Sequence, residues 1–109
     1  MKALRIGVDG VMQAVGISGE TIEQQNDSIH KLLGGYFDCV RLSFDAVMLV
    51  DDEGLLKGLP ENPAAMMFAN CPMLVGTALI VGVTAAEDGE IFTDCPERFL
   101  CFADKIARI

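Results

Sequence analysis

The side chains best suited to chemistry in this sequence are its thiols and its single imidazole. No two cysteines have the CxxC spacing of zinc sites and redox motifs, and one histidine, His30, does not complete a zinc ligand set with them. His30 is expected on a helix surface, since no cysteine or serine can be placed beside it as a nucleophile. The four cysteines, which we expect to be free thiols, are Cys39, Cys71, Cys95 and Cys101.

Cys95 is the cysteine most open to a catalytic interpretation. It precedes Pro96 at the start of a predicted helix, where the helix N-terminus would favour a thiolate. No acid or base partner can be named for it, so the pattern favours an ordinary buried or capping cysteine. An unusually reactive Cys95 would favour an enzyme, whereas four inert thiols would favour a binding protein.

The acidic run Asp51-Asp52-Glu53-Gly54 invites a cation-binding interpretation. A calcium loop, however, spaces its oxygen ligands across about twelve residues and ends on a distal glutamate, and this run does neither. We therefore interpret it as a solvated turn. Phosphate-binding glycine motifs are missing from the sequence as well. The sequence predicts no metal, no cofactor and no catalytic residues.

The distribution of charge is more informative than any single residue. The chain has 8 basic and 16 acidic side chains, a formal charge of -8, which argues against direct binding of nucleic acid. No basic residue lies between Lys57 and Arg98. If the hairpin near residue 88 lies beside the last helix, its carboxylates make one negative face that could steer a basic protein surface into contact. The carboxylates of this candidate face are Glu87, Asp88, Glu90, Asp94 and Glu97.

A simpler interpretation of the same charge is that it keeps a hydrophobic small protein soluble. The second candidate binding element is the loop from residue 57 to residue 62, because loops on a rigid scaffold often carry binding residues. Its alternative interpretation is a rigid turn followed by a helix start, with Asn62 as the cap and Pro63 in the first turn. The candidate residues of this loop are Lys57, Leu59, Glu61 and Asn62.

The composition predicts one folded domain over residues 1–109. Hydrophobic residues make up 51% of the chain and charged residues 22%, which excludes intrinsic disorder. The N-terminal sequence lacks the pattern of a secretory signal, so we expect a cytoplasmic protein. The uncharged stretch between Glu61 and Glu87 is broken by Pro72 and has acidic flanks, and this favours a buried strand over a membrane span.

Hydrophobic periodicity predicts an α+β fold with a mostly antiparallel sheet packed on a helix that follows the first hairpin, in a ββαββ arrangement resembling a β-grasp. Ile22, Ile29, Leu32 and Leu33 fall on one face of that helix. Phe99, Phe102, Ala103 and Ile106 form the stripe of a last helix, capped by Asp94 or Cys95. The predicted strands cover residues 3–8, 11–17, 36–44, 46–50, 55–58, 77–84 and 91–93, and the predicted helices cover residues 22–33 and 64–69 and a segment starting at residue 96.

Four segments carry a family resemblance: MKALRIGVDG, LLGGYFDCVRL, AVMLVDDEGLLKGLPENPAA and LVGTALIVGV. They resemble a family of small proteins of bacteriophages, plasmids and gut-bacterial mobile elements that is catalogued as domain of unknown function 3846. The most specific part is the run from Leu49 to Ala65. The resemblance implies a mobile-element accessory protein in the host cytoplasm, and it transfers no catalytic residues.

These observations lead us to expect a non-enzymatic protein that binds a host protein, such as an enzyme acting on nucleic acid with a basic groove. The alternative is a regulatory module that binds a small ligand in a pocket beside the sheet. We also expect a homo-oligomer, most simply a dimer, because six Met and six Phe exceed what a domain this small readily covers. The helix at Met66-Met67-Phe68 and the Phe99–Phe102 stripe are the apolar surfaces expected to pair.

Overall fold

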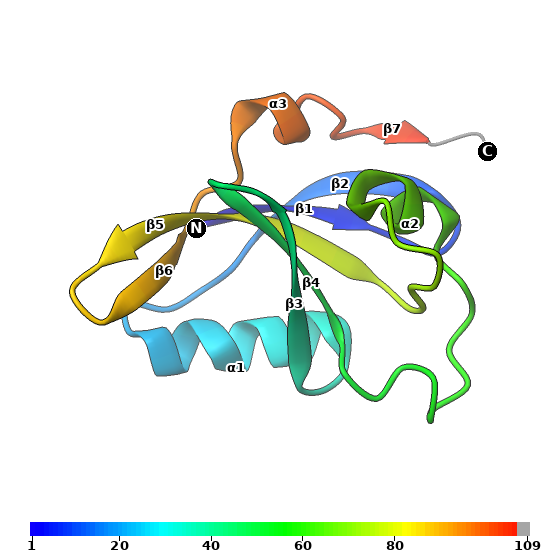
Figure 1. The fold of residues 1–109 in the computed structure, drawn as a ribbon, viewed down its shortest axis with the longest axis horizontal. Coiled ribbons are helices and arrows are strands. Elements are labelled where there is room, and N and C mark those ends of the chain that lie inside the picture. Colours follow the sequence, from blue (N-terminus) through cyan, green and yellow to red (C-terminus); the bar gives the residue numbers. More distant parts are fainter. Residues whose placement is uncertain (107–109) are drawn as a thin grey trace.

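The computed structural model describes residues 1–106, which form a seven-stranded sheet and three helices (Figure 1). Every strand pairing in it is antiparallel, so the expected α+β fold with a mostly antiparallel sheet is confirmed. The elements in chain order are β1 Lys2–Ile6, β2 Val11–Gly16, α1 Ile22–Leu33, β3 Phe37–Ser43, β4 Ala46–Asp51, α2 Pro63–Ala69, β5 Ala78–Ala86, β6 Gly89–Thr93, α3 Glu97–Leu100 and β7 Lys105–Ile106.

Strand β5 organises the sheet, whose order is β3-β4-β5-β1-β2-β7. One edge of β5 pairs with β4 and the other is shared, with β1 paired to residues 78–80 and β6 to residues 82–86. The element order begins β1-β2-α1-β3-β4, but β5 separates β1 from β4. The β-grasp-like ββαββ arrangement is therefore not confirmed.

Helices cover both faces of this sheet, α1 on one face and α2 with α3 on the other (Figure 1). Alternate residues of a strand point to opposite faces. Val47 and Leu49 of β4 accordingly pack on the α1 side, and Ala46 and Met48 pack on the α2 side. Burial on both faces explains why β4 and β5 have long apolar runs without polar alternation. Among residues 1–106, no helix is long and apolar enough to cross a membrane.

Helix α1 begins and ends where its sequence predicts. The Thr21 hydroxyl accepts a hydrogen bond from the Gln24 N–H at 3.1 Å, and Gly34 closes the helix with a left-handed φ of 87°. Ile29 is fully buried on the face toward the sheet. Ile22 does not join that buried face, since 63% of it is exposed.

Two predicted elements are wrong. Residues 52–58 form successive turns rather than a strand over 55–58. The last helix, α3, has only four residues and Pro96 as its N-cap. Asp94 and Cys95 do not cap it, because the Asp94 carboxylate accepts the Lys2 N–H at 2.7 Å and the Cys95 N–H donates to the Lys2 carbonyl at 2.8 Å.

The expected C-terminal stripe is divided by this early helix end. Ile106 lies in β7 and is 60% exposed, and Phe102 lies beyond the end of α3 and is 36% exposed. The rings of Phe99 and Phe102 both contact Phe68 of α2, with centroid distances of 6.2 and 5.2 Å. These aromatic side chains therefore pack within the monomer, and Met67 is the large apolar residue of α2 that stays exposed, at 66%. Self-association stays a prediction.

Candidate protein-interaction surface

Asn62, a candidate contact residue of the loop, is fully buried. Its amide nitrogen donates to the carbonyls of Ile6 at 3.0 Å and Gly76 at 2.9 Å. Its amide oxygen accepts the Ala65 N–H at 3.1 Å, which is the predicted N-cap of α2. The side chain thus ties α2 to β1 and to the segment before β5, and it is not available to a partner.

Lys57 also has an internal role. Its ammonium group lies 2.7 Å from a carboxylate oxygen of Asp51 and 3.2 Å from the Gly34 carbonyl at the end of α1. Burial raises the pKa of Asp51, but hydrogen bonds from Lys57 and from the Glu53 N–H outweigh it, so the pKa of the carboxyl is lowered. The predicted solvated turn is therefore anchored at its first carboxylate, while Leu59 is half-buried and Glu61 is exposed.

The five carboxylates of the candidate acidic face are not gathered in one place. Asp94 is bound to the Lys2 backbone, and Glu97 lies on α3 beside a hollow that Lys2 also lines. The six residue-to-residue steps from Asp88 to Asp94 span about 20 Å when the chain is extended. Glu87, Asp88 and Glu90 remain together at the β5–β6 hairpin, and this is the part of the predicted surface that the fold keeps as a group.

Residues 84–91, the hairpin arm, extend beyond the rest of the sheet. Pairing of β5 with β4 ends at Gly82 and pairing with β1 ends at Ile80, so the two strands of the arm pair only with each other. Every residue of the arm is exposed. Figure 1 shows the arm projecting at one end of the molecule, away from α2. An exposed two-stranded projection with acidic side chains is accessible to a partner from several directions.

The turn between β3 and β4 lies next to the arm and presents Phe44, of which 87% is exposed. Arg41 joins the two elements, because its guanidinium pairs with Glu90 and donates to the Ser43 carbonyl at 3.3 Å. The Val83 N–H also donates to the Asp45 carbonyl at 2.9 Å. The turn and the arm are therefore fixed to each other.

A second arginine fixes the same turn from α3. Arg98 pairs with both carboxylate oxygens of Asp45, at 2.9 Å for the longer contact, and donates to the Ser43 hydroxyl at 2.9 Å. The hydrogen bond from Arg98, helped by that from Ser43, holds the pKa of the Asp45 carboxyl well below its usual range. Sequence reasoning missed Phe44 and both arginines. The available signal was a large aromatic residue in a tight turn, where small polar residues are usual.

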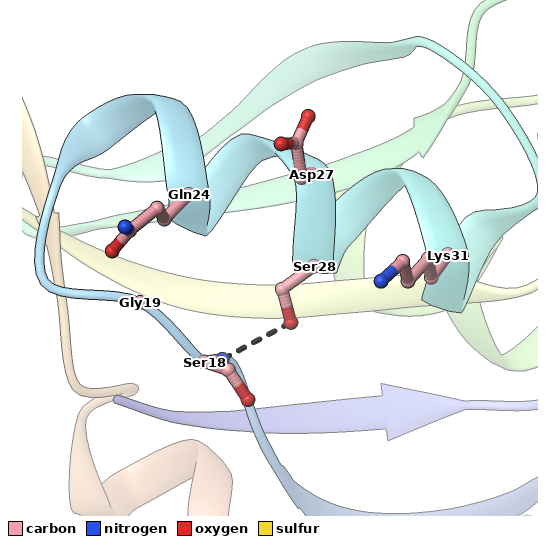
Figure 2. A pocket seen from close by; sticks show the side chains of 6 residues that line it. All are labelled: Ser18, Gly19, Gln24, Asp27, Ser28 and Lys31. Carbon is pink, nitrogen blue, oxygen red and sulfur yellow. Dashed lines mark hydrogen bonds between the residues drawn. The ribbon is translucent and has the colours of Figure 1, made fainter.

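A hollow of about 390 Å³ beside α1 is lined by polar residues (Figure 2). The Ser28 hydroxyl accepts the Ser18 N–H at 3.0 Å, and the Gln24 side-chain oxygen accepts the Glu20 N–H at 2.9 Å. Figure 2 shows the Asp27 carboxylate and the Lys31 ammonium group well apart and pointing in different directions. The groups in this hollow do not converge on a common point, as a catalytic set would need to.

Cys95 is buried, and its burial raises the pKa of the thiol to about 11. A protonated, inaccessible thiol is a poor nucleophile. Within residues 1–106, no group of three or more His, Cys, Asp or Glu side chains is placed to hold a metal ion. Cys39 and Cys101 are exposed free thiols, and Cys71 is partly exposed.

We expect Cys95 to resist alkylation by iodoacetamide in the folded protein at neutral pH, while Cys101 is modified. The exposure of Cys101 and the raised pKa of Cys95 give this order. Mass spectrometry of the digested protein measures modification at each cysteine, and unfolding in denaturant before alkylation is the control that should make both equal. Modification of Cys95 as rapid as that of Cys101 in the folded protein would favour the enzyme hypothesis.

The family model described as "Domain of unknown function (DUF3846)" matches residues 1–104 of the chain. No curated protein and no solved structure matches the chain.

Proposed function

The chain belongs to the DUF3846 family, and we propose that it is a non-enzymatic accessory protein of a phage or other mobile element that binds a host protein in the cytoplasm. The contact surface is the hairpin arm together with Phe44. The observation that carries this proposal is an 87% exposed aromatic side chain on a turn that Arg41 ties to a projecting acidic hairpin.

Charge and shape both support a protein partner with a basic surface. The formal charge of -8 favours rapid encounter with a positive surface and disfavours nucleic acid itself. Glu87 and Asp88 at the tip of the arm would make the first electrostatic contact. Phe44 would then supply the apolar anchor, since a large exposed aromatic side chain buries much apolar surface on binding.

A host enzyme that acts on nucleic acid fits this description, because its substrate groove is basic. An acidic arm in such a groove would exclude the substrate, so the proposed consequence of binding is inhibition. The alternative is a small-ligand or regulatory module of the element. That alternative predicts binding that does not depend on the charge of the arm.

The test is an affinity pull-down from host lysate with the unmodified protein and with the double variant Glu87→Lys/Asp88→Lys. Both substituted positions are exposed, so folding should be unaffected. We expect the reversed arm to lose the partner and the unmodified protein to lose it progressively between about 0.05 and 0.15 M salt. The matched control is Asp52→Lys/Glu53→Lys, which changes the net charge equally at the exposed turn after β4.

Recovery of the same partner by the arm variant would refute the role of the arm. Loss of the partner in the control variant alone would move the contact to the turn after β4. A control variant that behaves like the unmodified protein excludes a general effect of net charge, because both double variants gain the same charge.

A further inference from the structure

A small hollow of about 240 Å³ lies where the start of α1 meets β3 and the hairpin arm. Its apolar lining includes the rings of Phe37 and Phe92 and the aliphatic side chain of Ile22. Apolar residues of α1 are expected to face the sheet, but Ile22 is 63% exposed. Its side chain therefore forms an apolar wall of the hollow that solvent can reach. The sequence alone does not predict it, because its three walls come from distant segments.

Packed rings support the floor of the hollow. The centroid of Phe37 lies 6.2 Å from that of Phe92 and 5.8 Å from that of His30, and His30 also packs on Tyr36 at 4.7 Å. Neighbouring rings restrict the rotamers of Phe37, so the floor is formed before anything binds. A hollow of this size is smaller than the pockets that hold drug-sized ligands or cofactors. It suits one apolar side chain.

Polar groups on the rim indicate what surrounds that side chain. Gln25 and Asn26 contribute amide groups, which can pair with the backbone of an extended peptide. Glu90 also lines the hollow, and Glu87 and Asp88 follow at the tip of the same arm. Arg41 pairs with Glu90, so the negative charge beside the hollow rests on Glu87 and Asp88 at the tip of the arm.

Charge decides between a second copy of this chain and a basic partner. Two copies meeting at this end would bring four tip carboxylates together, Glu87 and Asp88 of each copy. Like charges brought into contact oppose association. A segment with lysine or arginine beside its apolar residue would instead gain from the same carboxylates.

We propose that this hollow, the α1–arm socket, receives one apolar or aromatic side chain of a basic peptide segment in the partner protein. The proposal rests on the proposed function and identifies the part of the partner that is recognised. Phe44 then contacts the partner outside the socket, and the arm carboxylates hold the residues that flank the inserted side chain.

The test is an NMR titration of the full chain with three capped peptides: Lys-Lys-Phe-Lys-Lys, Lys-Lys-Ala-Lys-Lys and Glu-Glu-Phe-Glu-Glu. We expect the first to bind at least about tenfold more tightly than the second, because burial of the phenyl ring adds at least that factor. The shifted amides should be those of Ile22, Gln25 and Phe92. The acidic peptide should not bind.

Two exposed apolar residues give a matched pair of variants. Ile22→Ser should reduce the advantage of the phenylalanine peptide several-fold, whereas Leu56→Ser, at an 87% exposed position on the turn after β4, should leave it unchanged. Equal affinity of the phenylalanine and alanine peptides would overturn the socket. Neutral acetyl-phenylalanine amide binding as tightly as the basic peptide would also overturn it and would indicate a small apolar ligand. Chemical shifts at the socket that depend only on protein concentration would overturn it too and would indicate a second copy of this chain.

The arm variant separates this proposal from the proposed function. Glu87→Lys/Asp88→Lys should weaken both basic peptides while preserving the ratio between them. If that variant loses the host partner but the phenylalanine and alanine peptides bind the unmodified protein equally, the proposed function is supported and the socket proposal is wrong. If the variant still binds the host partner, the proposed function is wrong, whatever the affinities of the peptides.

Discussion

Asn62→Ala should reduce the free energy of unfolding by about 3–5 kcal/mol, a large part of the total for a domain of this size. The substitution removes a fully buried amide that makes three hydrogen bonds. The carbonyls of Ile6 and Gly76 and the N–H of Ala65 would all lose their partner inside the protein. A buried polar group left without a partner costs about 1–3 kcal/mol.

Asn62→Asp tests which part of the amide matters. The aspartate keeps an oxygen for the Ala65 N–H, so the cap of α2 survives, but it places a carboxylate against two carbonyl oxygens that now accept from the amide nitrogen. We expect this variant to be destabilised as well. Chemical denaturation measures both variants, with Asn26→Ala at a partly exposed position as the control. A loss below about 1 kcal/mol for Asn62→Ala would mean that capping alone accounts for its role.

Asn62 also illustrates which contacts can be predicted from the sequence and which cannot. Its capping role follows from a local pattern, Asn followed by Pro at a helix start, and the structure confirms it. The hydrogen bonds to Ile6 and Gly76 join positions 56 and 14 residues away, and no local pattern encodes them. The caps of α1, the hairpin at Asp88-Gly89 and the buried strand β5 were predictable for the same local reason.

The predictions from sequence were wrong where a side chain that suits a local role instead bonds to a segment distant in the chain. Asp94 is a good helix cap by residue type, but its carboxylate accepts the Lys2 N–H, and α3 has Pro96 as its N-cap and no side-chain cap. The acidic face depended on how near the hairpin tip lies to α3, which only the path of the chain from Asp94 onward determines. Phe44 gains its position beside the arm through Arg41 and Glu90, which are 49 residues apart.

The meeting point of β1 and β6 on β5 gives the second large effect. Gly82 pairs with Ala46 on one side and Thr93 on the other, at the position where β6 ends and β1 takes over the same edge. A methyl group on Gly82 would lie 2.4 Å from the Asp94 carbonyl oxygen and 2.5 Å from the Thr93 hydroxyl. The first of these is a backbone atom, so a change of rotamer cannot relieve the contact.

Gly82→Ala should therefore reduce the free energy of unfolding by about 2–3 kcal/mol, as expected for overpacking in a region that cannot relax without moving the backbone. The control is Gly16→Ala in β2, where the added methyl group meets nothing within 4 Å. That variant should be neutral or slightly stabilised, because alanine restricts the unfolded chain more than glycine does. Thermal and denaturant unfolding of the two variants side by side measures the difference. Equal stability would show that residues 93–94 can shift away from β5, and the fixed geometry of the hairpin arm, which begins immediately beyond this point, would then no longer hold.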